Sequence, residues 1–319
     1  MRVVVTGGAG FIGSNLARFL QREHEVLVID KMRGSERLEN GNLQCFGHFK
    51  NLLDFTGELF VGDICEAGTL AKIREFAPHA IFHQAAISDT TAMNQNLVLR
   101  TNLSSFHALI SLAIELKAKL IYASSAAVYG DAPSPQIVGA SEAPKNPYAF
   151  SKLMMDTLAA KFYAKAHIVG LRYFNVYGRG EFFKDKTASM VLQFGLQMLG
   201  GARPRLFEGS DKIFRDFVYV DDVVSANLAA LNAKCGVYNV GSFTARAFTD
   251  IVDILQIELG THYEYEFIPN PFVKAYQFHT QAGENSRAAF DYAPKFSLES
   301  GIKAYVGEIR RIFEREVNA

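Results

Sequence analysis

The chain has 319 residues, of which 49% are hydrophobic and 21% are charged, as expected of a protein with a sizeable core. Lysine plus arginine equals aspartate plus glutamate, 33 of each, so nothing in the charge calls for a nucleic acid or an anionic membrane as partner. The 3 cysteines lie far apart and the 8 histidines form no cluster, which argues against a disulfide framework and a metal site.

The chain opens on an apolar run, residues 2–6, which predicts a strand buried on both faces and is too short for a signal-peptide core. Glycines follow in the run 7–13, and residues 14–23 have helical periodicity. The order strand, glycine-rich turn, helix lets a pyrophosphate approach the amides at a helix N-terminus. This pattern predicts a dinucleotide site with contacts from Gly7, Gly10, Phe11, Ile12 and Gly13.

A second strand over 25–30 ends in Asp30, about 20 residues beyond the glycines, where the adenosine ribose should lie. An acid at this place favours NAD, because it can bind the ribose hydroxyls. A group of cations follows, however, where a 2′-phosphate would lie, so we expect NADP and keep NAD as the alternative. These cations are Lys31, Arg33, Arg37 and Lys50.

Further strands over 59–64, 80–86, 119–123 and 167–172 alternate with helices over 66–76 and 97–116. This alternation predicts an α/β fold with a Rossmann-type, doubly wound parallel sheet, whose ligands lie at the carboxyl ends of the strands. No apolar run approaches the ~20 residues needed to cross a bilayer, so we expect a cytoplasmic protein without a membrane partner. Further candidate cofactor contacts are Asp63, Ile64, Gln84, Ala85, Ala86, Ser88, Asn102 and Val176.

Tyr148 and Lys152 follow a loop over 131–147 and open the next helix. Their spacing of four residues places a phenol and an ammonium on one helix face. A free tyrosine titrates near ~10, and a cation about 4 Å away in a cleft stabilises the phenolate by ~4 kcal/mol. We therefore expect Lys152 to lower the pKa of Tyr148 and make it a proton-transfer group.

Beyond residue 172 the alternation ends, which predicts a smaller C-terminal substrate-binding lobe. We expect helices over 187–199, 247–259 and 298–315 there, and a helix capped by Asp221-Asp222. The predicted division assigns residues 1–175, plus about 217–241, to an NADP-binding domain. Residues 176–216 and 242–319 form the predicted substrate-binding lobe.

The glycines, Ser125, Tyr148 and Lys152 together resemble the extended short-chain dehydrogenase/reductase superfamily of nucleotide-sugar enzymes. Further strings, beginning at residue 123, resemble one branch of it, whose members epimerise ADP-linked heptoses. These strings are the runs 123–130, 172–178 (RYFNVYG), 207–210 (FEGS), 215–220 (RDFVYV) and 276–282, and Lys184 with the Ala188-Ser189 that follows.

The resemblance implies roles for individual residues. Tyr148 would be the principal acid/base, Lys152 would hold the nicotinamide ribose, and Ser125 would bind the reacting hydroxyl. Lys184, which also contacts the cofactor, aligns with the second acid/base of the family, although Lys186 leaves that register open. Lys186 and Gln193 replace a serine and a histidine of the family. Implied substrate contacts are Ser125, Asn175, Lys186, Gln193, Phe207, Glu208, Gly209, Ser210, Arg215 and Tyr276.

The resemblance further implies an isomerase that oxidises and re-reduces one sugar carbon with bound NADP, and a homo-oligomer. A 4,6-dehydratase is excluded because Ser125-Ala126-Ala127 stands where Thr-Asp-Glu is expected. A UDP-hexose 4-epimerase is the enzymatic alternative and would need no second base near residue 184. A non-catalytic NADP sensor would have no use for the Tyr148–Lys152 pair.

Overall fold

The computed structural model describes residues 1–270, 278–283 and 290–317. A seven-stranded sheet of parallel strands forms its centre, in the order β3-β2-β1-β4-β5-β6-β10. This order confirms the predicted doubly wound, Rossmann-type sheet. Its strands are β1 (Arg2–Thr6), β2 (Glu25–Asp30), β3 (Glu58–Val61), β4 (Ala80–His83), β5 (Lys119–Ser125), β6 (Ile168–Tyr173) and β10 (Gly236–Val240).

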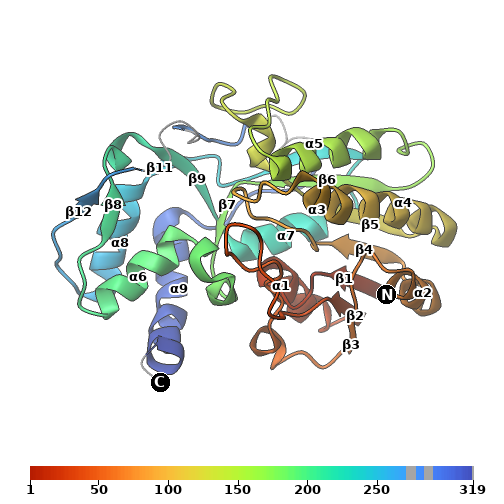
Figure 1. Ribbon diagram of the computed structural model, residues 1–319, viewed down its shortest axis with the longest axis horizontal. Helices are drawn as coiled ribbons and strands as arrows, with labels where there is room; N and C mark the ends of the chain where they lie inside the picture. Colours follow the sequence, from red (N-terminus) through yellow and green to blue (C-terminus); the bar gives the residue numbers. More distant parts are fainter. Residues whose placement is uncertain (271–277, 284–289, 318–319) are drawn as a thin grey trace.

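Helices cover both faces of this sheet (Figure 1). On β1, Val3 and Val5 pack in a cluster with α1 and α7, whereas Val4 packs in a second cluster with α2, α4 and α5. Because neighbouring residues of a strand point to opposite faces, a sheet covered twice needs continuous apolar strands. These helices are α1 (Phe11–Leu20), α2 (Ala67–Phe76), α4 (Ser105–Leu116), α5 (Pro147–Ala160) and α7 (Val220–Ala230).

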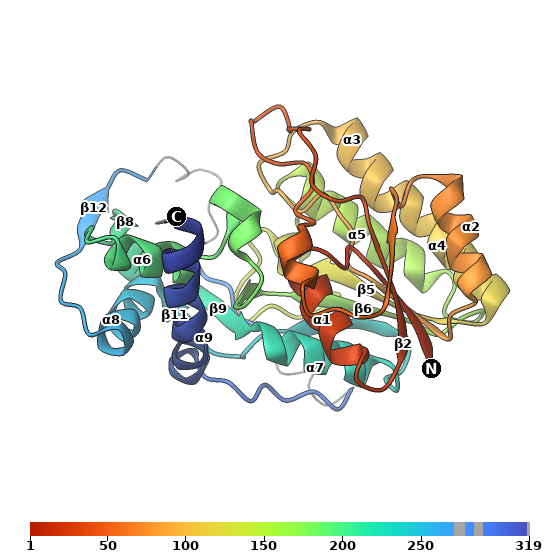
Figure 2. The same ribbon diagram turned by 90° about the horizontal axis from the view of Figure 1, so that it is seen from below.

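A smaller lobe lies beside the sheet and has an apolar cluster of its own. In it, α9 packs against α6 and α8, and short strands form a three-stranded sheet, β11-β9-β7, and a pair, β12-β8. Figures 1 and 2 show this lobe on one side of the molecule. Its elements are β7 (Asn175–Tyr177), α6 (Met190–Leu199), β8 (Arg205–Phe207), β9 (Phe214–Tyr219), β11 (Ala245–Ala247), α8 (Phe248–Leu259), β12 (Glu266–Ile268) and α9 (Leu298–Ile312).

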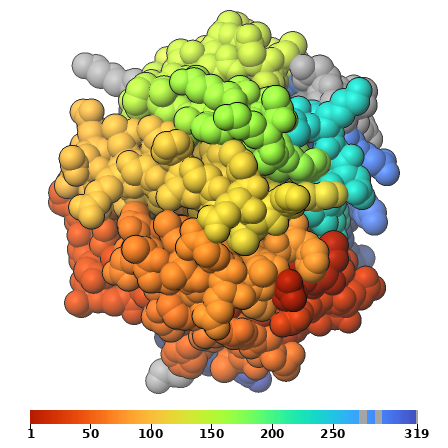
Figure 3. All heavy atoms as spheres, turned by 90° about the vertical axis from the view of Figure 1, so that its right-hand side faces the viewer, coloured from red at the N-terminus to blue at the C-terminus, as the bar shows by residue number. Residues whose placement is uncertain are grey.

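The face turned away from the smaller lobe is formed mostly by the first half of the chain. Figure 3 shows this face in red through green, with the blue C-terminal segments only at its margins. The two parts of the molecule therefore meet on the opposite side, where the chain crosses from β6 into β7.

The predicted helix over 97–116 is three segments: α3 (Gln95–Leu99), a π-helical turn η2 (Arg100–Ser104) and α4. Together they form the one helical stretch in the described ranges that is long and apolar enough to cross a bilayer, which the sequence analysis did not anticipate. Phe106, Leu109 and Ile110 are fully buried against the sheet, as in the core helix of a globular domain. Core packing therefore explains the apolar composition of this stretch.

The prediction that Asp222 caps a helix is wrong. Helix α7 begins at Val220 and has no side-chain cap, whereas the buried Asp222 carboxylate accepts hydrogen bonds from the backbone N–H groups of Lys295 and Phe296, at 2.8 and 3.1 Å. The Asp222 carboxylate thus holds the segment that leads into α9, and its partner Lys295 is 73 residues away in the sequence.

Replacing Leu255 of α8 with alanine should lower the free energy of unfolding by about 2–5 kcal/mol, because the fully buried side chain leaves a cavity in the cluster of α6, α8 and α9. Ile257, on the same helix, is 78% exposed, and its replacement by alanine should change stability by no more than about 0.5 kcal/mol. Urea unfolding of both variants measures the difference. Equal losses would contradict the packing described here.

Candidate active site

A cavity of about 360 Å³ lies at the carboxyl ends of the sheet strands and reaches residues of the smaller lobe. It brings together most of the residues that the sequence indicates for cofactor binding and catalysis. These are Gly7, Gly10, Phe11, Ile12, Gly13, Asp30, Lys31, Asp63, Ile64, Gln84, Ala85, Ala86, Ser88, Ser125, Tyr148, Lys152, Val176 and Lys184.

The glycine turn between β1 and α1 is built for close approach of backbone. Gly7 has φ +68°, and a Cβ on it would lie 2.7 Å from the amide nitrogen of Ala85. A Cβ on Gly13 would lie 2.1 Å from the carbonyl oxygen of Gly7. Gly10 is the N-cap of α1 and has no side chain to cap it, so the first-turn N–H groups remain available to an anion. These features fit the pyrophosphate of a dinucleotide.

Asp30, at the end of β2, uses its carboxylate to hold the protein backbone. It is buried and accepts hydrogen bonds from the N–H groups of Ala9 and Met32, at 2.9 and 2.8 Å. Burial raises the pKa of Asp30, and these hydrogen bonds oppose the increase. The side chain still lines the cavity, but both oxygens already have protein donors.

The predicted cluster of cations does not gather in this cavity. Lys31 lines it and lies 3.5 Å from the Asp63 carboxylate, whereas Lys50 forms an ion pair with Glu316 at 2.7 Å. Arg33 lines a second cavity of about 390 Å³. Arg37 is exposed in a bridge with Leu43 and lines neither of these cavities.

Helix α5 places Tyr148 and Lys152 at the cavity. Asn146 begins the helix by accepting a hydrogen bond from the N–H of Ala149 at 2.8 Å, and Pro147 occupies the first helical position. Tyr148 is 9% exposed and Lys152 is 2% exposed, with the Lys152 Nζ 5.9 Å from the centre of the tyrosine ring. The Lys152 ammonium donates a hydrogen bond to the carbonyl of Ala123 at 2.7 Å.

Burial works against the predicted lowering of the tyrosine pKa. In the protein alone, burial raises the pKa of Tyr148, and its hydrogen bond with the Ser125 side chain opposes the increase. Burial also lowers the pKa of Lys152, to about 8, so a smaller fraction of this side chain is protonated near neutral pH than of a free lysine. In the protein without a cofactor, desolvation of both groups therefore outweighs the expected lowering of the Tyr148 pKa by Lys152.

A buried polar network supports Lys152 from one helical turn below. Asp156 accepts hydrogen bonds from the hydroxyls of Tyr122 and Ser124, at 2.9 and 3.1 Å, and from the guanidinium of Arg172 at 2.9 Å. Its negative charge raises the pKa of Lys152 against the effect of burial. Arg172 also binds Glu142 at 2.8 Å, which ties the loop over the site to the same network.

Lys184 reaches the cavity from the short helix η4 (Phe182–Thr187) of the smaller lobe. Its Nζ lies 5.6 Å from the centre of the Phe11 ring, which belongs to the glycine turn. Burial lowers the pKa of Lys184, and the negative charge of Glu181 opposes this change. The neighbouring Lys186 is exposed and lines the second cavity.

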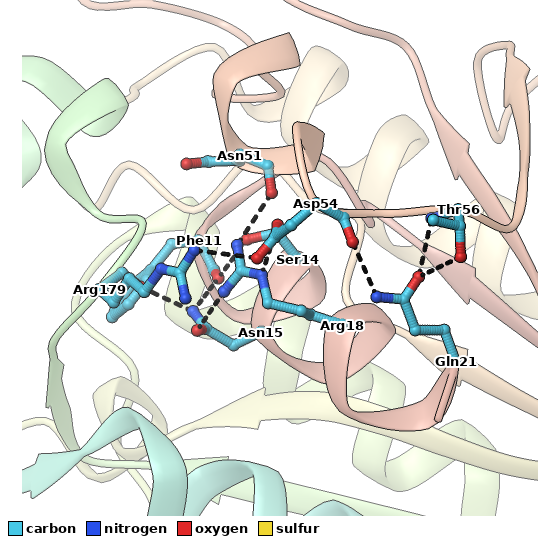
Figure 4. Close-up of polar contacts among 9 residues, drawn as sticks. All are labelled: Phe11, Ser14, Asn15, Arg18, Gln21, Asn51, Asp54, Thr56 and Arg179. Atoms are coloured by element: carbon cyan, nitrogen blue, oxygen red, sulfur yellow. Dashed lines mark hydrogen bonds and ion pairs between the residues drawn. The ribbon is translucent and has the colours of Figure 1, made fainter. Parts of the chain in front are cut away.

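The segment before η4 is fastened to α1. The Asn15 side chain donates a hydrogen bond to the carbonyl of Arg179 at 2.7 Å, and Asp54 binds both Arg18 and Arg179, at 2.8 and 3.1 Å (Figure 4). Asn51 donates to the carbonyls of Ala9 and Gly180 at 3.1 and 3.2 Å. The glycine turn and the segment that leads to Lys184 are thereby held in one unit.

The remaining candidate substrate residues lie apart from this cavity. Gln193 lines the second cavity together with Lys186. Arg215 is buried, with its guanidinium 6.0 Å from the centre of the Phe248 ring. Tyr276 lies outside the described residues. The others line neither of these two cavities; they are Asn175, exposed on β7, Phe207 at the end of β8, and Glu208, Gly209 and Ser210 between β8 and β9.

Asn102 acts behind the cavity wall. Its side chain accepts a hydrogen bond from the N–H of Ile87 at 2.9 Å and donates to the carbonyl of Ile87 and the hydroxyl of Ser151. Cavity residues that the sequence analysis missed include Gln44, Cys45, Phe46 and Gly47, in a loop without periodicity, and Tyr173 and Phe174. Tyr173 and Phe174 belong to the RYFNVYG run, so this motif could have indicated them as cavity residues.

Other arrangements for chemistry are not apparent. Within residues 1–270, 278–283 and 290–317 there is no group of three or more His, Cys, Asp or Glu that could hold a metal ion. Cys45, Cys65 and Cys235 are free thiols. Burial raises the pKa of Cys45 to about 11, so this thiol in the cavity wall is a poor nucleophile near neutral pH.

Comparison with known proteins agrees with this geometry. The chain is 33% identical over 314 residues to an ADP-L-glycero-D-manno-heptose-6-epimerase of Brachyspira hyodysenteriae, covering 95% of this chain and 96% of the relative. The crystal structure of the Helicobacter pylori ADP-L-glycero-D-manno-heptose-6-epimerase is 45% identical, with a TM-score of 0.89 and coverage of 97% and 96%. A Thermus thermophilus UDP-glucose 4-epimerase, solved as a complex with NAD, is 28% identical, with a TM-score of 0.81 and coverage of 97% and 99%.

The resemblance inferred from the motifs is thereby confirmed, and the chain is an enzyme of the epimerase type. Residues 3–241 match the model of the NAD dependent epimerase/dehydratase family, and the chain belongs to this family.

Proposed function

We propose that this enzyme epimerises C6 of an ADP-linked heptose, interconverting ADP-D-glycero-D-manno-heptose and ADP-L-glycero-D-manno-heptose, with bound NADP. Support comes from the 33% and 45% identity to two ADP-heptose 6-epimerases over nearly the whole chain, against 28% for the UDP-glucose 4-epimerase. The matched strings in the second half of the chain point in the same direction.

One observation carries the proposal: Tyr148 and Lys184, from the two parts of the molecule, line the same cavity. The two epimers present their hydroxyl groups on opposite faces of the reacting carbon. Two acid/base groups on opposite sides of this carbon can each exchange the proton of one epimer. A phenol from α5 and an amine from η4 offer proton transfer on both sides.

The chemistry follows from the carbon to be inverted, which has no acidic neighbouring proton. When bound, the nicotinamide cofactor supplies a hydride acceptor and donor that is regenerated in each cycle. Tyr148 exchanges the hydroxyl proton on one face of the sugar carbon, and Lys184 exchanges it on the other. Ser125 positions the reacting oxygen through its hydrogen bond with Tyr148. Lys152 holds the ribose of the cofactor.

The remaining assignments are part of the same proposal. Residues 1–175, with about 217–241, bind NADP, and residues 176–216 and 242–319 bind the ADP-sugar. The enzyme is a cytoplasmic homo-oligomer whose product serves the inner core of lipopolysaccharide. The proposed substrate contacts are Asn175, Lys186, Gln193, Phe207, Glu208, Gly209, Ser210, Arg215 and Tyr276.

The alternative is a UDP-hexose 4-epimerase, which the TM-score of 0.81 to the Thermus thermophilus structure supports at the level of the fold. That reaction places no demand on a base at residue 184. The position of Lys184 in the cavity therefore favours the heptose reaction.

Incubation with ADP-D-glycero-D-manno-heptose should yield the L-glycero epimer, detected by NMR, without added NADP if the cofactor remains bound during purification. UDP-glucose serves as the control substrate and should not be converted. Conversion of UDP-glucose to UDP-galactose, with no change in the heptose, would establish the alternative.

Tyr148→Phe should lower the epimerisation rate by at least ~100-fold, because the phenol oxygen that exchanges the proton is removed while the ring remains. Cofactor binding should persist, since the glycine turn is unchanged. Tyr163→Phe is the matched control, because Tyr163 does not line the cavity. Equal turnover of the Tyr148 variant and the unaltered enzyme would reject the assignment.

NADP should stabilise the cofactor-free protein at lower concentration than NAD in a thermal-shift titration. Both carboxylate oxygens of Asp30 accept hydrogen bonds from backbone N–H groups and are less available to ribose hydroxyls. Lys31 lines the cavity, and its partly exposed ion pair with Asp63 costs little free energy to break, so its ammonium can bind a 2′-phosphate. A ligand at 100 times its Kd adds about 2.7 kcal/mol of stability, which is readily measured. Lys31→Ala should bring the concentrations at which NADP and NAD stabilise the protein closer together. Stabilisation by NAD at the lower concentration would refute the NADP assignment.

A further inference from the structure

Glu181 is a buried carboxylate for which the proposed chemistry has no direct use. It precedes η4 and is 0% exposed. Placing an ionised acid in the interior is costly unless its oxygens are fully bonded and its charge is balanced. The hydrogen bonds and charges around the Glu181 side chain therefore indicate its role.

The carboxylate of Glu181 joins the two ends of the segment that carries Lys184. It accepts a hydrogen bond from the N–H of Gly178 at 3.0 Å, and from the N–H and the hydroxyl of Ser189 at 2.6 and 2.8 Å. Gly178 lies just after β7, and Ser189 is the N-cap of α6. The segment from 178 to 189 is thus closed around one side chain, with Lys184 at its centre.

The backbone of Lys184 is attached to the same residue. Its N–H donates to the carbonyl of Glu181 at 2.9 Å, and its own carbonyl accepts a hydrogen bond from the Thr187 hydroxyl at 2.8 Å. The preceding carbonyl of Arg179 accepts a hydrogen bond from Asn15 (Figure 4), and that of Gly180 accepts one from Asn51. The position of Lys184 at the cavity therefore follows from bonds on both sides of Glu181.

The charges of Glu181 and Lys184 interact. Two phenols also interact with this carboxylate, those of Tyr177 on β7 and Tyr305 on α9, and neither carries a positive charge. Around Lys184, α1 presents the neutral ring of Phe11. Burial raises the pKa of Glu181 and lowers that of Lys184, and in each case the partner's charge opposes the change.

We propose that Glu181 is a positioning residue that holds Lys184 at the cavity and supplies the negative charge against which its amine titrates. This role rests on the proposed function of Lys184 as the second acid/base. Lys184 must gain and lose a proton in each cycle, and a nearby carboxylate stabilises the protonated form. The acid also keeps the amine at one place while the sugar carbon presents either face.

Glu181→Gln tests this role, because it keeps the shape of the side chain and removes the charge. The rate at the pH optimum should fall roughly tenfold, as for the loss of a charged hydrogen-bonding partner. The limb of the pH–rate profile that reports Lys184 should move to lower pH, because the ammonium loses the carboxylate that stabilises it. NADP affinity, measured by thermal shift, should be unchanged.

Two comparisons separate this role from a purely structural one. In a Lys184→Met background, Glu181→Gln should cause no further loss of rate, because it acts through the missing amine. Asp222→Asn is the control, since Asp222 also binds two backbone N–H groups while buried but lies outside the cavity wall. It should lower the melting temperature without moving the pH–rate profile.

Each outcome is decisive. A Glu181→Gln enzyme that is slower by the same factor at every pH would reduce Glu181 to a structural role and overturn the inference, as would equal losses in both backgrounds. If the residual rate of Lys184→Met is too low to measure, the pH–rate profile decides alone. Absence of heptose epimerisation in the unaltered enzyme would instead refute the proposed function.

Discussion

The desolvation of charge is the constraint on which the site depends. Tyr148, Lys152 and Lys184 all line one cavity, and burial pushes the phenol and the two amines toward their neutral forms. For the phenol, proton transfer near neutral pH requires that this shift be reversed, whereas a lowered pKa brings an amine closer to neutral pH. Two buried, hydrogen-bonded carboxylates limit that lowering, Asp156 for Lys152 and Glu181 for Lys184.

The same balance explains why the tyrosine depends on its ligand. Ser125 is the group in the protein that lowers the pKa of Tyr148, and the hydrogen bond is weaker than the effect of burial. A cationic ring bound in this cavity would lower that pKa further, since opposite charge within about 4–6 Å favours the phenolate. In the protein alone, burial therefore favours the protonated phenol.

Local patterns predicted the sheet and the cofactor cavity well. The strand, glycine turn and helix over 2–20 are adjacent in sequence. The strand ends at Gln84 and Ser125 converge because parallel strands share one carboxyl edge. The periodicity of two or 3.6 residues determines which side chains reach the core, so this information is present in short windows of sequence.

Partners distant in sequence could not be predicted in this way. Lys50 is adjacent to the basic loop, yet it pairs with Glu316, 266 residues away. Asp222 resembles a helix cap, but it binds the backbone before α9. Such pairings depend on how elements pack, and no local signal distinguishes a cation free to bind phosphate from one that is already paired.

The smaller lobe and the sheet domain both contribute residues to the cavity where they meet. Lys184 belongs to the smaller lobe by sequence, but Asn15 and Asn51 bind the carbonyls just before η4 to the glycine turn. The proposed second acid/base is therefore fixed to the glycine turn, rather than to the strands β8 and β9, which carry Phe207 and Arg215 among the proposed sugar contacts. A sugar carbon can then turn between two faces while both proton-transfer groups stay in place, which is the geometric requirement for inverting a centre by oxidation and reduction in one cavity.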